Sequence, residues 1–273
     1  MELLQYALLA MSAAGLGAVG GLGGAVLLVP ALVLLGMSPA EAAPLGLLSV
    51  AAGSISAAPS QLRDRSVNHR IGIVTELAAV TGAVAGATIA GALSPRILTY
   101  LLAGAAAAGA VLGLRRAPSA AFVDPAYGRA DVGERVGRLA GAYPAPGGGV
   151  VPYEPRRLPT ALGLMTIAGL VAGTAGTSGG FIKTPTETEV MGLPLRVATA
   201  TTTFTVGITA SAALLVAAID GRLDLRDALA VVAGSLLGGQ LGAGLQRALP
   251  DRSVRRLLAL VLGAAAVVLV VRA

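Results

Sequence analysis

Long apolar segments dominate this chain and limit the folds open to it. Eight of them, separated by short turns with charged residues, lie at 4–36, 40–62, 71–93, 96–114, 159–192, 195–219, 226–249 and 252–271. A bilayer core about 30 Å thick needs roughly 20 apolar residues per helix, and only 12% of the residues are charged. The sequence therefore predicts an all-α integral membrane protein.

The composition also argues against several kinds of function. There are no cysteines, and His69 is the only histidine, so disulfides and metal sites held by cysteine or histidine are excluded. The net charge of +6 comes almost wholly from arginines in the turns between apolar segments, so we expect no nucleic-acid partner. Because no nucleophile–base pair, phosphate-binding loop or metal motif is present, we expect neither an enzyme nor a cofactor.

The chain repeats itself on either side of a polar segment. Pro30 and Pro39 are nine residues apart, as are Pro185 and Pro194, and a glycine pair precedes each proline pair. Small residues at a spacing of four also recur in both halves: Gly82, Gly86, Ala90, Gly234, Gly238 and Gly242. Such residues let helices pack closely in lipid, but the matched order of elements indicates a repeat.

We therefore divide the chain into a first transmembrane repeat at 1–114, a polar cytoplasmic linker at 115–158 and a second repeat at 159–273. The linker is rich in arginine, aspartate and glutamate and holds the run PAPGGG, which is typical of a surface loop. Its residues 132–140 could form a short amphipathic turn on the membrane surface or stay disordered.

The topology depends on the long segments 4–36 and 159–192. As single crossings they give eight spans and divide the basic residues outside the linker six against seven. As broken helices or hairpins they give inverted repeats with three crossings each, and they place eight arginines on one side and four on the other. The positive-inside rule favours the second arrangement. We expect the turn at 63–70 to be cytoplasmic, with the turn at 220–227 and both termini outside.

The glycine-rich breaks in these two segments are the expected substrate site. Irregular backbone at membrane depth occurs where it is buried in protein or lines a cavity, and converging amides can bind an anion. The residues that we expect to contribute are Gly20, Gly21, Gly23, Gly24, Pro30, Thr177, Ser178, Gly179, Gly180 and Pro185. The alternative is that these glycines only permit close packing of helices.

Lys183, the only lysine, lies three residues after Gly180 in apolar surroundings. It could attract an anionic solute, pair with Glu187 or Glu189 of its own segment, or extend to the lipid headgroups. Each alternative stays open at this point, and we expect Lys183 to bind the solute.

Hydroxyls and one carboxylate complete the expected site. Threonines follow Lys183 in a run that could donate hydrogen bonds to an oxyanion or bond back to their own helix: Thr199, Thr201, Thr202, Thr203 and Thr205. Glu76 lies within another apolar segment, where it could carry a coupling proton or could pair with His69 or Arg70.

The sequence from 169 to 210, which contains GGFIKTP and MGLPLRVATATTTFTVGITA, resembles the TauE/SafE family of membrane proteins, named for sulfite and sulfonate export. The segment GLGAVGGLGGAVLLVPALVLLGMSPAEAA at 15–43 resembles the N-terminal copy of the same motif. The resemblance covers nearly the whole chain except the linker. The TPTETE run at 184–189 is more polar than the usual aliphatic run, which indicates a site dominated by the second half.

The resemblance implies a multi-pass transporter of the cell membrane that carries small, often sulfur-containing anions without ATP. We expect an alternating-access site between the repeats for sulfite, a sulfonate, thiosulfate or a similar anion. The expected partners are this anionic solute and the bilayer, and a homo-oligomer is left open. The alternative is a non-transporting membrane subunit or partner of a larger complex.

Overall fold

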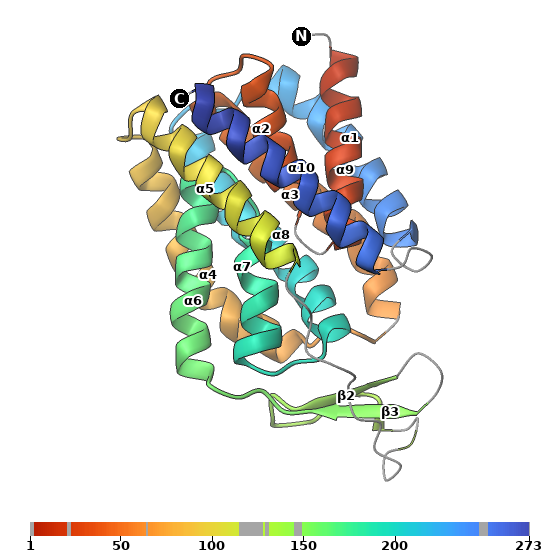
Figure 1. The fold of residues 1–273 in the computed structure, drawn as a ribbon. Helices are drawn as coiled ribbons and strands as arrows, with labels where there is room; N and C mark the ends of the chain where they lie inside the picture. The colour runs from red at the N-terminus through yellow and green to blue at the C-terminus, as the bar shows by residue number, and fades with distance from the viewer. Residues whose placement is uncertain are drawn as a thin grey trace.

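The fold is a bundle of helices with a small sheet at one end (Figure 1), seen in a computed structural model that describes residues 3–20, 23–63, 65–114, 128, 131–144, 149–245 and 251–272. The helices are α1 (Leu3–Gly20), α2 (Ala25–Leu34), α3 (Pro39–Arg63), α4 (His69–Ala90), α5 (Pro95–Leu114), α6 (Leu158–Ala175), α7 (Gly180–Pro185), the π-helix η2 (Thr186–Val190), α8 (Leu195–Ile219), α9 (Leu225–Leu245) and α10 (Asp251–Arg272). Within the described residues, five helices are long and apolar enough to cross a membrane: α3, α4, α6, α8 and α9. The predicted all-α membrane protein is confirmed.

Both of the long apolar segments are broken in two. Residues 21–24 separate α1 from α2, and residues 176–179 separate α6 from α7. In Figure 1, α2 turns back beside α1, and α7 with η2 turns back beside α6. Gly176 and Gly179 have φ values of +67° and +64°, a left-handed conformation that favours glycine. The glycines therefore explain why α6 ends and α7 begins where they do.

Each half packs its first helix against a helix of the other half. The helix α1 lies along α9 of the other half, and α6 lies along α4. A Cβ at Gly82 would stand 2.0 Å from the carbonyl oxygen of Thr166, and one at Gly234 would stand 2.0 Å from that of Ala7. The small residues spaced by four therefore allow close packing of helices, as expected for such residues in lipid. Those of α4 contact α6, the first helix of the second half, and those of α9 contact α1, the first helix of the first half.

Apolar side chains both fill the interior of the bundle and cover its outer surface. Alanines are frequent among the least exposed positions, including Ala10, Ala83, Ala106, Ala168, Ala198 and Ala213, and larger side chains such as Leu28, Ile71 and Phe181 are buried with them. Large apolar side chains stand exposed on the outer faces of the helices, including Ile73, Leu77, Leu215, Leu229 and Leu241. A surface with so many large apolar side chains suits lipid rather than water.

The linker contains a sheet that the sequence analysis did not predict. Three antiparallel strands, β1 (Gly133–Glu134), β2 (Gly141–Pro144) and β3 (Val150–Tyr153), pair in the order β1-β2-β3. Tyr143 and Val151 pack against Val197 at the start of α8. The sheet therefore lies against the end of the helical bundle at which α6 begins (Figure 1).

Two expectations for the linker were wrong. Residues 132–140 do not form an amphipathic turn on the membrane; they form β1 and the turn into β2. The described residues on either side of the PAPGGG run are not a plain loop, because Tyr143, Val150 and Val151 lie in the paired strands β2 and β3, whereas residues 145–148 of the run lie outside the described part of the chain. Aromatic and β-branched residues on either side of a glycine-rich turn are a hairpin signal, which the high charge of the linker obscured.

Candidate functional site

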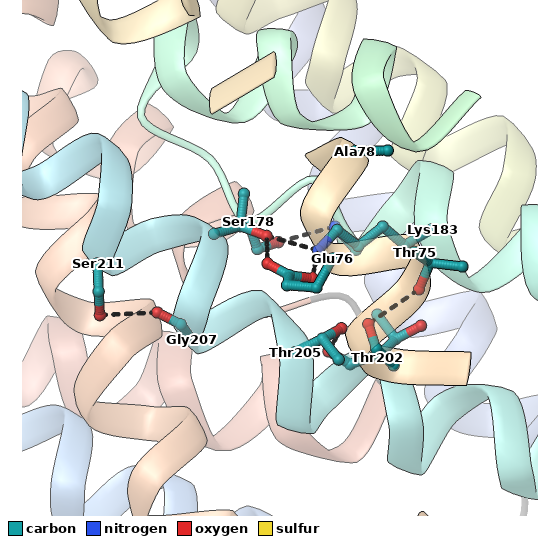
Figure 2. Close-up of polar contacts among 12 residues, drawn as sticks. Thr75, Glu76, Ala78, Ser178, Lys183, Thr202, Thr205, Gly207 and Ser211 are labelled. Atoms are coloured by element: carbon teal, nitrogen blue, oxygen red, sulfur yellow. Dashed lines mark hydrogen bonds and ion pairs between the residues drawn. The ribbon is translucent and has the colours of Figure 1, made fainter. Parts of the chain in front are cut away.

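An ion pair between Lys183 on α7 and Glu76 on α4 forms the charged centre of the bundle (Figure 2). The Lys183 Nζ atom lies 2.6 Å from Glu76 Oε2, and their side chains are 1% and 5% exposed. Thr209 on α8 joins the two, since its hydroxyl accepts a hydrogen bond from Lys183 at 2.5 Å and donates one to Glu76 Oε1. A buried ion pair persists when hydrogen bonds satisfy its remaining atoms, as Thr209 does here.

The partners of both charges differ from those weighed in the sequence. Lys183 does not pair with a glutamate of its own segment, because α6, which forms a hairpin with α7 and η2, packs along α4 and so brings Glu76 to Lys183 across 107 residues of sequence. Glu76 in turn does not pair with His69 or Arg70. Those two residues lie at the start of α4 and approach Glu134 of β1 instead, at 2.7 and 3.5 Å.

The two glycine-rich breaks meet inside the bundle. A Cβ at Gly23, which has a φ of +78°, would stand 2.3 Å from the Cβ of Ser178. A Cβ at Gly46 of α3 would stand 2.5 Å from the carbonyl oxygen of Gly176. Gly24 caps α2 and packs against the backbone of α1. The predicted proximity of the two breaks is therefore observed.

The break between α1 and α2 contributes glycines to the site, and the helix α2 that follows it contributes no polar side chain. Gly20 ends α1, and Gly21 lies outside the described residues. Pro30 is buried in the middle of α2, whose ten residues, AVLLVPALVL, are all apolar. The hydroxyls and charges of the site therefore come from the second break and from the helices around it.

Two of the backbone amides expected to bind an anion are already bonded within the protein. The amide of Thr177 donates to the carbonyl of Ala172 at 3.1 Å, and that of Gly180 donates to the Ser178 hydroxyl at 3.3 Å. Farther along α7, the Lys183 amide completes the first helical turn by donating to the carbonyl of Gly179. Side chains are thus better placed than these amides to receive a solute.

The threonine run divides into bonded and unbonded hydroxyls. Thr203 and Thr205 donate to carbonyls of their own helix at 2.8 and 3.3 Å, as the alternative for membrane threonines held. The Thr201 hydroxyl accepts a bond from the amide that precedes α4, at 3.0 Å. Thr202 is fully buried, and its hydroxyl has no partner among the described residues. Thr199 is buried one turn before Thr203.

Three buried side chains of the second hairpin and of the facing helix α8 lack hydrogen-bond partners within the described chain: Thr177, Glu187 and Thr202. All three have a relative exposure of 0%. Glu187 lies in η2, which directly follows Pro185 at the end of α7, and both of its carboxylate oxygens are unpartnered. Buried polar atoms without partners are rare in proteins, so these three side chains are unlike ordinary packing.

Sequence reasoning missed two residues that organise the site. Thr209 lies seven residues after Thr202 and so shares its face of α8, a spacing that could have drawn attention to it. Asn68 directly precedes α4, and its side-chain oxygen accepts a bond from the amide of Ile71 at 2.9 Å. An asparagine immediately before an apolar helix is a recognisable capping signal.

The family described as Sulfite exporter TauE/SafE matches residues 6–269, which include both broken segments and the ion pair. No curated protein and no solved structure matches the chain. The match extends over nearly the whole length and agrees with the apolar helices of the fold. This chain therefore belongs to the sulfite exporter TauE/SafE family of membrane transporters.

Proposed function

We propose that this protein carries small sulfur-containing oxyanions, such as sulfite, a sulfonate or thiosulfate, across the plasma membrane. The observation that carries the proposal is the position of Lys183, the only lysine of the chain. It lies five residues after Ser178, where the two breaks meet, and its side chain is 1% exposed. A buried cation inside a membrane bundle is expensive unless it serves a solute or an internal partner.

Lys183 can donate a hydrogen bond to an anion while it stays paired with Glu76. Its ammonium group has three N–H donors, of which the described residues use two, one to Glu76 and one to Thr209. The third donor suits one oxygen of an oxyanion, and the unpartnered hydroxyls of Thr202 and Thr177 are candidate donors to its other oxygens. Glu76 is the counter-ion with which the anion shares Lys183, and it is one candidate for a coupling proton.

We further propose that the two repeats are inverted and that they alternate access to this site. The reciprocal packing of α1 on α9 and of α6 on α4 supports this, as do hairpins that open toward opposite ends of the bundle in Figure 1. The ion pair itself joins the repeats, because Glu76 belongs to the first half and Lys183 to the second. Movement of one half against the other would therefore stretch or break the pair.

Purified protein in liposomes provides the test. We expect time-dependent uptake of at least one labelled anion among sulfite, thiosulfate and methanesulfonate, and no uptake of a labelled organic cation. Protein-free liposomes and liposomes with heat-denatured protein are the controls. Absence of flux for all three anions would contradict the proposal and favour a non-transporting subunit of a larger complex.

A further inference from the structure

Glu187 is a buried ionisable residue near the proposed anion site, and the proposed function gives it no role. It is fully buried in η2, and neither carboxylate oxygen has a hydrogen-bond partner among the described residues. The Thr202 hydroxyl on α8 lies close enough to interact with it, yet that hydroxyl also lacks a bond of standard geometry. An ionised carboxylate without partners is far more expensive to bury than a neutral carboxylic acid.

Among the described residues, few charged groups surround Glu187. Lys183 on α7 and Glu76 on α4 both act on it, with opposite signs. The helix α6, which packs against η2, carries no ionisable residue. Arg196 is the only ionisable residue of α8 and lies at its first turn, and Glu189 of η2 is exposed. A change in the charge of Glu187 therefore acts electrostatically mainly on the Lys183–Glu76 pair.

Charge balance gives Glu187 a specific consequence for an anion. Lys183 and Glu76 together are neutral, so an ionised Glu187 would leave one net negative charge in this buried cluster and would repel an anion. A protonated Glu187 leaves the cluster neutral and adds an O–H donor near that of Thr202. The two protonation states of Glu187 thus differ in their affinity for the solute.

We propose that Glu187 is the proton-binding residue of the anion site, so that an anion binds beside Lys183 only while Glu187 carries a proton. The proposal rests on the proposed transport of anions and adds the ion that enters the site with the solute. Glu187 takes one proton from water and holds it as O–H, and no bond of the solute is made or broken. By linkage, anion affinity falls about tenfold for each pH unit above the point at which Glu187 loses its proton.

The test is the binding of methanesulfonate to the full-length protein in detergent, measured by calorimetry from mildly acidic to mildly alkaline pH. This anion stays ionised throughout, so a pH effect belongs to the protein. We expect binding to wild-type protein to weaken with rising pH. The Glu187→Gln variant, whose neutral amide imitates the protonated acid, should bind with an affinity that pH does not change. The control Glu189→Gln, two residues away and exposed, should follow the wild type.

A pH dependence that survives in Glu187→Gln would overturn the inference and move the titrating group elsewhere, with Glu76 the next candidate. Absence of binding by the wild type at every pH, for sulfite and thiosulfate as well, would overturn the proposed function and this inference with it. Thermal unfolding without solute is the second measurement. Since a neutral Glu187 resembles glutamine, the variant should unfold within a few degrees of wild type at neutral pH, and a loss as large as that of a broken buried ion pair would contradict a protonated Glu187.

Discussion

Single glycines set how closely the two halves approach each other. A Cβ at Gly169 of α6 would stand 1.9 Å from the carbonyl oxygen of Ala79 on α4. A Cβ at Gly163, on the same helix, would meet nothing within 4 Å. Because lipid is as apolar as a helix surface, close backbone contact is a main source of helix association in membranes. The stability of the bundle should therefore depend on Gly169 and not on Gly163.

Substitution of each glycine by alanine tests this dependence. Gly169→Ala should lower the free energy of unfolding by about 1–3 kcal/mol, because the added methyl group forces α6 away from α4. Gly163→Ala should leave it unchanged or raise it slightly, since alanine is the better helix former. Thermal unfolding of the purified variants in detergent gives the comparison. Equal destabilisation by both substitutions would show that close packing at Gly169 is not the cause.

The sequence identified residues that are unusual in apolar surroundings, but it could not identify their partners. Lys183 and the threonine run stand out in any membrane segment. The pairing of Lys183 with Glu76 depends on which helix of the first half faces α7, and 107 residues separate the two. The regular spacing of residues within one helix reports its own faces only, so the Glu76 contact and the unpartnered state of Glu187 required the fold.

At the level of elements, Asn68 ties the start of α4 to the linker sheet. Its side-chain oxygen caps α4, and its side-chain amide donates to the carbonyl of Leu139 at 3.1 Å and to the hydroxyl of Tyr153 at 3.0 Å. Asn68 is fully buried under these contacts. Asn68 therefore bonds a transmembrane helix to two points of the linker, beside the contacts of His69 and Arg70 with Glu134, and its loss should loosen the sheet.

Two substitutions separate the roles of Asn68. Asn68→Ala removes the cap and both sheet contacts and should cost about 1–3 kcal/mol of stability. Asn68→Ser retains a capping oxygen but is too short to reach Leu139, so it should be less destabilising while loosening the sheet equally. Hydrogen exchange of residues 141–153, or tryptic cleavage after Arg138, should be faster in both variants than in wild type. Unchanged protection in both would contradict the proposed tie.

The elements differ in how far the sequence could predict them. The apolar segments located the helices closely, and the glycine clusters located the breaks at 21–24 and 176–179. The sequence could not predict the π-helix η2, because its hydrogen-bond pattern depends on which donors bond to the backbone carbonyls before it. Pro185 has no amide hydrogen, and the Thr186 hydroxyl donates to the carbonyl of Ile182 at 2.8 Å. The Met191 amide then bonds five residues back, to Thr186.

At the scale of the whole molecule, orientation in the membrane follows from the distribution of arginine. Inverted repeats with a hairpin each would put the turn at 63–70 and the linker in the cytoplasm and the turn at 220–227 outside. The order of the helical segments was predictable from hydropathy. The exchange of partners, in which α1 and α6 each pack on the other half, was not, since hydropathy says nothing of contacts between segments.

The absence of cysteine in this chain makes orientation directly measurable. In intact cells, a membrane-impermeant maleimide should label Asp220→Cys, whereas Arg65→Cys should react only after permeabilisation. Both positions are exposed, so accessibility to water is not the limiting factor. Labelling of both positions from the outside would contradict inverted repeats, and the reverse pattern would contradict the expected orientation.

The central claim, that Lys183 serves a solute rather than only the fold, can be tested by removing its charge alone and together with that of Glu76. Lys183→Met alone leaves Glu76 buried without its partner and should destabilise the protein, typically by about 3–5 kcal/mol. The double variant Lys183→Met/Glu76→Gln replaces the pair by neutral groups and should recover most of that stability.

Flux of the transported anion into liposomes is the deciding measurement. We predict that the double variant is stable but transports at least about tenfold more slowly than wild type, since a charge-assisted contact to the anion is lost. Recovery of wild-type flux together with stability would contradict the account, because the pair would then serve the fold alone.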